Sequence, residues 1–293
     1  MIYRIYGQKD STIYEQDALR AQNAGGDEIL EVTKFYDTLT DSILIGNSRV
    51  LTQFDISTIS ASISAGTISS NCKFYLNLTS TEMLKGYLLS KMDSDEKKIE
   101  LNELWKRRIS ELGEISKKAD LEFSIAWLRA KYAQSIRPGK KGSVNEDFEK
   151  ITSRFHSWVR DHKDLIGLTD KTSYYNFVKI NFDFYSKLYL RIYDAAHNFK
   201  PGFENLYYVE NRKFPESYYY PLIMAPIEID DSDDEVQKKI VLVSKFLEMY
   251  IVIRSVNRKT LASSSIRYTM FNLIKEIRNK SVHELSELFK KKI

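Results

Sequence analysis

The sequence has a single cysteine among 293 residues, which excludes a disulfide scaffold and a zinc site made of thiolates from one chain. Its four histidines are scattered, which argues against a histidine-rich metal site. No apolar run approaches the roughly 18 residues that a transmembrane helix needs, so we expect no membrane span. The first residues, MIYRIYGQKD, contain no apolar signal core, and we therefore expect a soluble chain in the cytoplasm.

Motifs typical of common catalytic sites are also missing. The chain contains no Gly-x-x-x-x-Gly-Lys-Ser/Thr phosphate loop and no Gly-x-Gly-x-x-Gly dinucleotide motif. It contains no Gly-x-Ser-x-Gly nucleophile elbow and no His-Glu-x-x-His zinc motif. We therefore predict no catalytic residue, no cofactor and no bound metal in this chain.

The composition nevertheless supports a folded core, since hydrophobic residues make up 43% of the chain and aromatic residues 13%. Charge is unevenly distributed. Residues 1–80 hold 6 Lys/Arg and 9 Asp/Glu, a net charge of −3, whereas residues 81–293 hold 38 and 31, a net charge of +7. All five prolines and all three tryptophans lie in the second part. The sequence therefore predicts two parts of different character.

The first part carries strand signals. Runs rich in β-branched and aromatic residues, separated by turns that contain glycine, occur at 2–6, 28–36, 49–56 and 72–78. Four strands are few for a β-sandwich, which usually has about seven. We therefore expect residues 1–78 to form a small, incomplete antiparallel β portion with exposed edges. Cys72 falls on the apolar face of the last strand and is interpreted as a small buried hydrophobic residue.

From Thr79 onward the hydrophobic period becomes helical. Capping boxes are predicted at Thr79 with Glu82, at Ser143 with Glu146 and at Ser281 with Glu284. About eight amphipathic helices follow, including a long aromatic one over 175–196, and the fold class is mainly α with an all-α domain over 79–293. The predicted core includes Trp105, Trp127, Leu128, Phe155, Trp158, Phe182, Leu247 and Met270.

Three polar or aromatic features could indicate a site, and each has a simpler structural explanation. His156 and His162 are six residues apart and would lie on different helix faces, so shared metal ligation is not expected. His156, between Phe155 and Trp158, is interpreted as making a satisfied interior hydrogen bond. The acidic run Asp230, Asp231, Asp233 and Asp234 lacks the spacing of a calcium loop and is interpreted as a solvated helix start. The run 218–220 of three tyrosines could stack on bases, but core packing is the preferred interpretation.

Basic residues outside the apolar stripes are the one surface feature that indicates a partner. They cluster in a loop and in a later segment, and the candidate DNA phosphate contacts are Arg137, Lys140, Lys141, Arg254, Arg258, Lys259 and Arg267. Phosphate binding needs only such clusters and no base recognition. The alternative is that these side chains only solvate helix ends.

The helical part resembles GmrSD-type proteins, which are modification-dependent (type IV) restriction endonucleases and their relatives in defence against phage. The resemblance is carried by LNLTSTEMLKGYLLSKM (76–92), LNELWKRRISEL (101–112), AWLRAKYAQSIR (126–137), NEDFEKITSRFHSWVRD (145–161) and SSIRYTMFNLIKEIRNKSVHEL (264–285). It covers residues 76–293 and implies a helical region that follows a catalytic half. The family's Asp-Gly-Gln-Gln-Arg motif, associated with nucleotide hydrolysis, and its HNH nuclease domain have no counterpart in this sequence.

Residues 1–80 are similar to the N-terminal part of tailed-phage virion (neck) proteins, through MIYRIYGQKDSTIYE, NAGGDEILEVTKFYD and GNSRVLTQFDIS. The two resemblances meet at FYLNLTSTE (74–82), which indicates a natural fusion or a mis-joined assembly of reads.

Three functions follow from these resemblances. The chain is expected to be a scaffold or DNA-contacting portion of a defence protein, with its catalytic nuclease or NTPase subunit on another chain. Alternatively, it is a virion structural protein with an acquired helical domain, or a chimeric reading frame without a selected function. The first implies a bacterial cytoplasmic location, and the second a virion.

Overall fold

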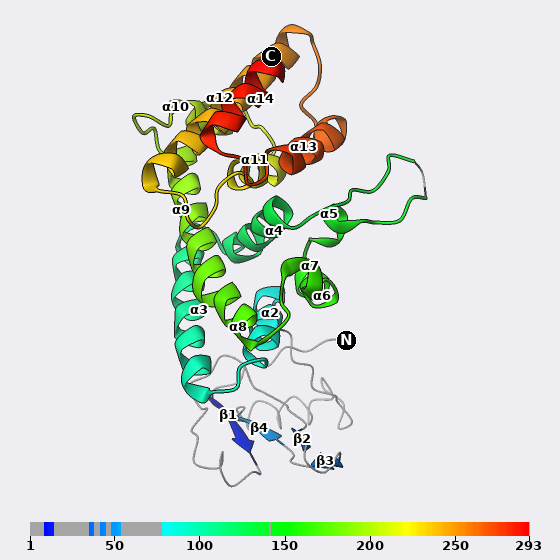
Figure 1. Cartoon of the computed structure of the whole chain (residues 1–293), viewed down its shortest axis with the longest axis vertical. Helices are drawn as coiled ribbons and strands as arrows, with labels where there is room; N and C mark the ends of the chain where they lie inside the picture. Colours follow the sequence, from blue (N-terminus) through cyan, green and yellow to red (C-terminus); the bar gives the residue numbers. More distant parts are fainter. Residues whose placement is uncertain are drawn as a thin grey trace, which may run out of the picture. The chain divides into compact units, whose positions relative to one another are not determined.

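The computed structural model describes residues 78–140 and 142–292 in full, together with the backbone of four strands nearer the N-terminus. The chain divides into two compact units, residues 1–78 and 79–293. The second unit is built from helices alone over its described residues (Figure 1). The prediction of a mainly α chain with a multi-helix domain is confirmed.

The strands of the first unit form two antiparallel pairs. β1 (Lys9–Tyr14) pairs with β4 (Ser48–Gln53), and β2 (Phe35–Asp37) pairs with β3 (Ser42–Leu44). β4 overlaps the strand expected at 49–56, and β2 overlaps the end of the one expected at 28–36. The runs at 2–6 and 72–77, with Cys72, lie outside the described residues, so the incomplete sandwich stays a prediction.

The helical unit begins at the predicted capping box. α2 (Ser80–Leu89) starts after Thr79, whose hydroxyl accepts from the Glu82 amide while the Glu82 carboxylate accepts from the Thr79 amide. α3 (Asp95–Ile115) follows, with Ser94 as its cap, and α4 (Ala119–Lys131) ends five residues earlier than the apolar spacing suggests. α4 stops because the amides of Gln134 and Ser135 donate to Asp147 instead of to the preceding helical turn.

The single helix expected from Ser143 to Val159 is wrong. The chain forms α5 (Asp147–Lys150) and α6 (Phe155–Asp161), with a break at Ile151, whose ψ of 80° is not helical. Ser143 does not cap α5. Its hydroxyl donates to the Lys140 oxygen, and Glu146 with Glu149 forms the capping box instead. A one-turn helix, α7 (Lys163–Ile166), follows.

The expected long aromatic helix is continuous but not uniform. α8 (Lys171–Asn176) passes into a π-helical segment, η1 (Phe177–Phe182), and then into α9 (Asp183–His197). The wider π turn brings Phe177 and Phe182 onto the core side, where both are buried. Asp183, at the end of the π segment, accepts from Arg108 at 2.7 Å and pairs with Lys187 at 2.6 Å.

The remaining helices match the expected pattern more closely. Short α10 (Glu204–Asn211) and α11 (Glu216–Met224) occupy the proline-rich stretch, as predicted. α12 (Asp233–Val256), α13 (Ser263–Ile277) and α14 (Val282–Lys292) complete the unit. The Ser281 and Glu284 capping box forms as expected. None of the described helices is both long enough and apolar enough to cross a membrane.

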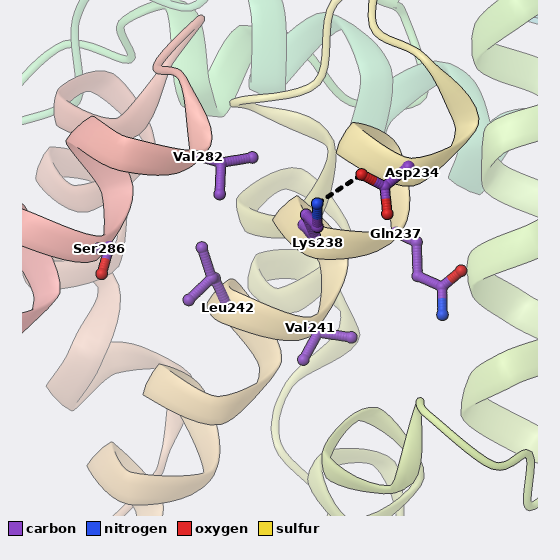
Figure 2. Close-up of a pocket in the computed structure, with 7 residues that line it drawn as sticks. All are labelled: Asp234, Gln237, Lys238, Val241, Leu242, Val282 and Ser286. Atoms are coloured by element: carbon purple, nitrogen blue, oxygen red, sulfur yellow. Dashed lines mark hydrogen bonds and ion pairs between the residues drawn. The ribbon is translucent and has the colours of Figure 1, made fainter.

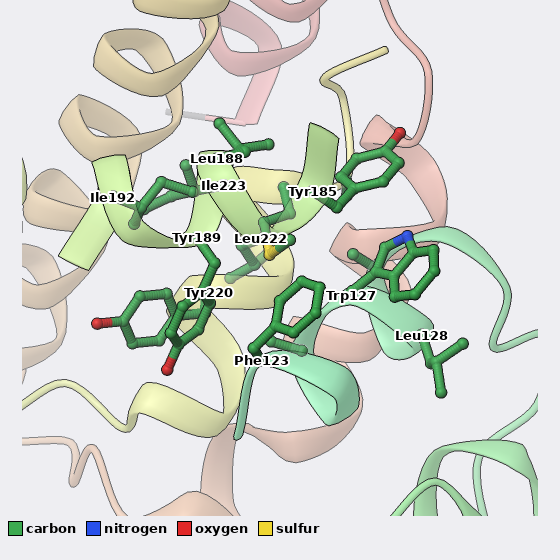
Figure 3. Close-up of a cluster of buried hydrophobic side chains, with 14 of the residues drawn as sticks. Phe123, Trp127, Leu128, Tyr185, Leu188, Tyr189, Ile192, Tyr220, Leu222 and Ile223 are labelled. Atoms are coloured by element: carbon green, nitrogen blue, oxygen red, sulfur yellow. The ribbon is translucent and has the colours of Figure 1, made fainter. Parts of the chain in front are cut away.

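Aromatic side chains from α3, α4, η1 and α9 form the centre of the core. Trp105 stacks on Phe182 with ring centroids 4.0 Å apart, and Trp127 stacks on Phe177 at 4.9 Å. Figure 3 shows Phe123, Trp127, Tyr185 and Tyr189 packed with the leucines and isoleucines of α9 and α11. All eight predicted core residues are buried, including Trp127, Leu247 and Met270.

The burial of side chains tests two other interpretations from the sequence, those of the tyrosine run and of the acidic run. All three tyrosines of 218–220 are buried, which confirms that they are core residues. The acidic run is a helix start as predicted, with Ser232 as the cap and with Asp233 and Asp234 exposed. Asp231 differs, because its carboxylate pairs with the buried Lys239 at 2.6 Å.

Candidate nucleic-acid interface

Helix α13 is fixed against the C-terminal end of α4 by its own basic side chains. Arg278 donates to the main-chain oxygens of Ala130 and Ala133, each at 2.8 Å, and Lys275 donates to that of Gln134 at 2.7 Å. Cations are favourable at a helix C-terminus because the last carbonyl groups lack helical partners. These contacts place α13 beside the chain that leaves α4.

That chain forms a loop whose two ends are tied together. Asp147 accepts from the amides of Gln134 and Ser135 at 2.9 and 3.1 Å and from the Trp158 indole at 3.1 Å. Burial raises the pKa of Asp147, but these donors outweigh burial and hold it below its usual value. The loop between the ties, described over residues 138–140 and 142–145, extends from the body of the unit (Figure 1).

Arg137 and Arg267 are brought together where this loop meets α13. An Arg267 guanidinium nitrogen donates to the Arg137 oxygen at 3.3 Å, and another faces the Glu149 carboxylate at 3.5 Å. The Arg137 amide donates to that carboxylate at 2.8 Å, and its guanidinium donates to Asn145 at 3.3 Å. Both arginines are half-buried, so each combines a structural contact with partial access to solvent.

Arg254 shapes the connection between α12 and α13. Its guanidinium donates to the Thr260 oxygen at 3.0 Å through Nε and to the Ser265 hydroxyl at 3.0 Å, and it lies over the Tyr250 ring. Arg258 adopts a left-handed conformation with φ of 53° just after the helix. The Arg258 amide donates to Ser255 and the Lys259 amide to Arg254, which is the Schellman arrangement of a helix end.

The N-terminal turn of α13 adds partial positive charge to the same region. It consists of Ser263, Ser264 and Ser265, all exposed. The cap position, Ala262, supplies no side-chain acceptor, and the first turn contains no acidic residue. Free amide groups at a helix start attract anions, and phosphate is a common one.

The seven residues predicted as phosphate contacts therefore differ in their surroundings. Lys140, Arg258 and Lys259 are exposed, and their side chains make no hydrogen bond or ion pair with another described residue. Arg137, Arg254 and Arg267 each hold a turn or a loop in place. Lys141 lies outside the described residues. We call the group formed by Arg137, Lys140, Arg258, Lys259, Arg267 and the first turn of α13 the α13 basic surface.

The half-buried Lys131 and the buried Lys239 were missed because they lie within amphipathic helices. Lys131 donates to the oxygens of Ala225 and Ile227 at 3.1 and 3.0 Å, and burial lowers its pKa to about 7. Lys239 donates to the Pro226 oxygen at 2.9 Å as well as to Asp231. Both ammonium groups hold the connection between α11 and α12, and this role is structural.

His156 takes part in a chain of hydrogen bonds rather than in a catalytic pair. The Ser80 hydroxyl donates to the Ser153 oxygen, so it must accept from His156 Nδ1 over 3.1 Å. His156 Nε2 then accepts from the Ser157 hydroxyl, also at 3.1 Å. His156 Nδ1 donates a hydrogen bond to the Ser80 hydroxyl, so the imidazole cannot deprotonate that hydroxyl. These bonds join α2 to α6, and His156 is satisfied as expected but in a half-buried rather than an interior position.

Within residues 78–140 and 142–292, no three side chains of His, Cys, Asp or Glu are grouped closely enough to hold a metal ion. No protein-family model, no curated protein and no solved structure matches the chain. The family resemblance therefore depends on the sequence strings alone.

Proposed function

We propose that residues 79–293 serve as a helical scaffold that contacts DNA phosphates without reading bases, as the helical portion of a GmrSD-type defence protein. The observation that supports this most is the contact of Arg267 with Arg137 and Glu149. It joins two basic segments, far apart in sequence, into the α13 basic surface. The catalytic centre, a nuclease or an NTPase, is assigned to a separate subunit.

The chemistry of this surface suits a phosphate backbone. Lys140, Arg258 and Lys259 are exposed cations on two loops. The uncapped start of α13 directly follows the second of these loops in the sequence and precedes Arg267 in the same helix. In Figure 1 both loops extend toward the side of the unit on which α13 lies. Flexible cations can follow phosphates, while main-chain amides fix the register.

Binding is expected to be weak and strongly dependent on salt. Contacts with phosphates alone give dissociation constants of about 10⁻⁴–10⁻⁶ M at physiological salt. A duplex of any sequence should bind with similar affinity, since the proposed contacts are with phosphates and none is with a base edge.

The experiment compares two variants of equal charge. In one, Lys140, Lys141, Arg258 and Lys259 are changed to alanine. In the control, the four exposed cations Lys117, Lys118, Arg154 and Lys163 are changed to alanine. Fluorescence anisotropy with a labelled duplex at low salt should show at least about tenfold weaker binding for the first variant. Equal affinity for both variants would contradict the proposal, because net charge alone would then explain binding.

A further inference from the structure

Helix α12 carries an apolar row on its outer face that no described part of the chain covers. Met249, Val252, Ile253 and Val256 are 39%, 42%, 44% and 77% exposed. Their spacing places them on one side of the helix, opposite the fully buried Leu247. A contiguous exposed apolar patch on a soluble protein indicates an interaction surface.

The same outer face is hollowed nearer the start of the helix. A groove of about 430 Å³ lies between α12 and α14, with Val241, Leu242 and Val282 as its apolar lining. Figure 2 shows these side chains, with the ion pair of Asp234 and Lys238 at the edge of the groove. Leu242, Met249 and Val256 are seven residues apart, so the groove and the exposed row share one face.

We propose that this face is the interface of a homodimer in which two copies of α12 pack antiparallel. An isologous interface must be complementary to itself, and here one end of the face is hollow while the other end protrudes. A two-fold axis passing the helix at the level of residue 247 brings Val252 of one copy opposite Leu242 of the other. The same axis brings Ile253 opposite Val241, so the exposed row of each copy fills the groove of the other.

Charge favours the same orientation. The helix begins with Asp233 and Asp234, whose side chains are 102% and 71% exposed. Antiparallel packing separates the acidic starts of the two copies and opposes the two helix dipoles. Parallel packing would bring the two acidic starts together.

The polar residue in the middle of this face is compatible with the interface. Lys245 is exposed and falls opposite Met249 across the axis. Its methylene stem can pack against the thioether chain while the ammonium group stays in water at the rim. The antiparallel register therefore leaves no charge buried without a partner.

The oligomeric state of the full chain tests the interface. Sedimentation velocity should show a dimer for the native chain and at least about a tenfold larger dimer dissociation constant for Val252→Glu, equivalent to 1.4 kcal/mol. Val144→Glu is the matched control, because Val144 is 74% exposed on the loop before α5. A native chain that stays monomeric, or an equal effect of both substitutions, would overturn the proposal. Circular dichroism verifies that each variant is folded.

Disulfide trapping tests the orientation, in chains in which Cys72 is replaced by serine. Under mild oxidation, a mixture of the Leu242→Cys and Val252→Cys chains should cross-link, since the antiparallel register brings these positions together. Val252→Cys alone should cross-link at least about tenfold less. Efficient cross-linking of Val252→Cys with itself would indicate parallel packing and overturn the register.

Discussion

Arg267 donates a hydrogen bond to the main-chain oxygen of Arg137, a residue 130 positions earlier in the chain, over 3.3 Å. The Glu149 carboxylate lies against both residues, at 2.8 Å from the Arg137 amide and 3.5 Å from the Arg267 guanidinium. A single half-buried carboxylate therefore anchors the loop before α5 to α13. The position of Arg137 relative to Arg267 in the α13 basic surface depends on that anchor.

Removal of the anchor should loosen the loop. Glu149→Ala leaves the Arg137 amide without its acceptor, and we expect the free energy of unfolding to fall by about 1–3 kcal/mol. The Arg137 amide should also exchange hydrogen faster. Urea denaturation and hydrogen exchange measure the two effects. Glu103→Ala is the control, because the Glu103 side chain is 68% exposed, and an equal loss of stability in that variant would contradict the assigned role.

Arg258 offers a way to separate stability from binding. Its φ of 53° is costly for a residue with a side chain, and glycine adopts this conformation without that cost. Arg258→Gly should therefore raise the free energy of unfolding by about 0.5–1 kcal/mol, measured by thermal and urea denaturation, while it weakens duplex binding.

Lys213 provides the matched control for that substitution. It adopts a φ of 56° just after α10, where the Phe214 amide donates to the Val209 oxygen in the same kind of helix end. Lys213→Gly should stabilise the fold to a similar degree and leave duplex binding unchanged. Weaker binding in both variants, or in neither, would show that the Arg258 side chain has no particular part in binding.

Asp147 should make stability sensitive to acid. Its pKa lies below the usual 3.8 in the folded state, so the carboxylate stabilises the fold above that pH, and this contribution is lost as pH falls through the folded-state pKa. Asp147→Asn places an amide group against the donors from Trp158 and the loop. We expect it to lower the free energy of unfolding by about 2 kcal/mol at pH 7.

The pH profile distinguishes this effect from simple loss of packing. The difference between the native chain and Asp147→Asn should be constant above about pH 5 and should shrink below the ordinary carboxyl pKa. Urea denaturation at a series of pH values gives the curve. A difference that does not change between neutral and acidic pH would assign the loss to packing rather than to the carboxylate charge.

Local signals predicted the helical fold well, and contacts across the chain explain the errors. The box of Thr79 with Glu82 is complete within four residues, so the sequence contains all that determines the start of α2. The helix expected from Ser143 fails because Asp147 bonds to Gln134 and Ser135, a dozen residues earlier. The hydrophobic periodicity of the segment itself cannot predict such a contact.

The candidate site follows the same rule. Exposed Lys140 and Lys259 were identifiable from charge and position alone. The structural roles of Arg254 and Arg267 were not, because their acceptors are main-chain oxygens that carry no sequence signal. The π segment at Phe177–Phe182 was hidden for a similar reason, since its aromatic spacing also suits an α-helix.

The salt dependence of duplex binding tests the central claim most directly. Each phosphate neutralised by a cation contributes about 0.9 to the slope of log K against log salt concentration. The variant with alanine at Lys140, Lys141, Arg258 and Lys259 should therefore show a slope smaller by about 3–4 than the native chain. The control variant at Lys117, Lys118, Arg154 and Lys163 should keep the native slope. An unchanged slope in the first variant would show that the α13 basic surface does not contact DNA phosphates.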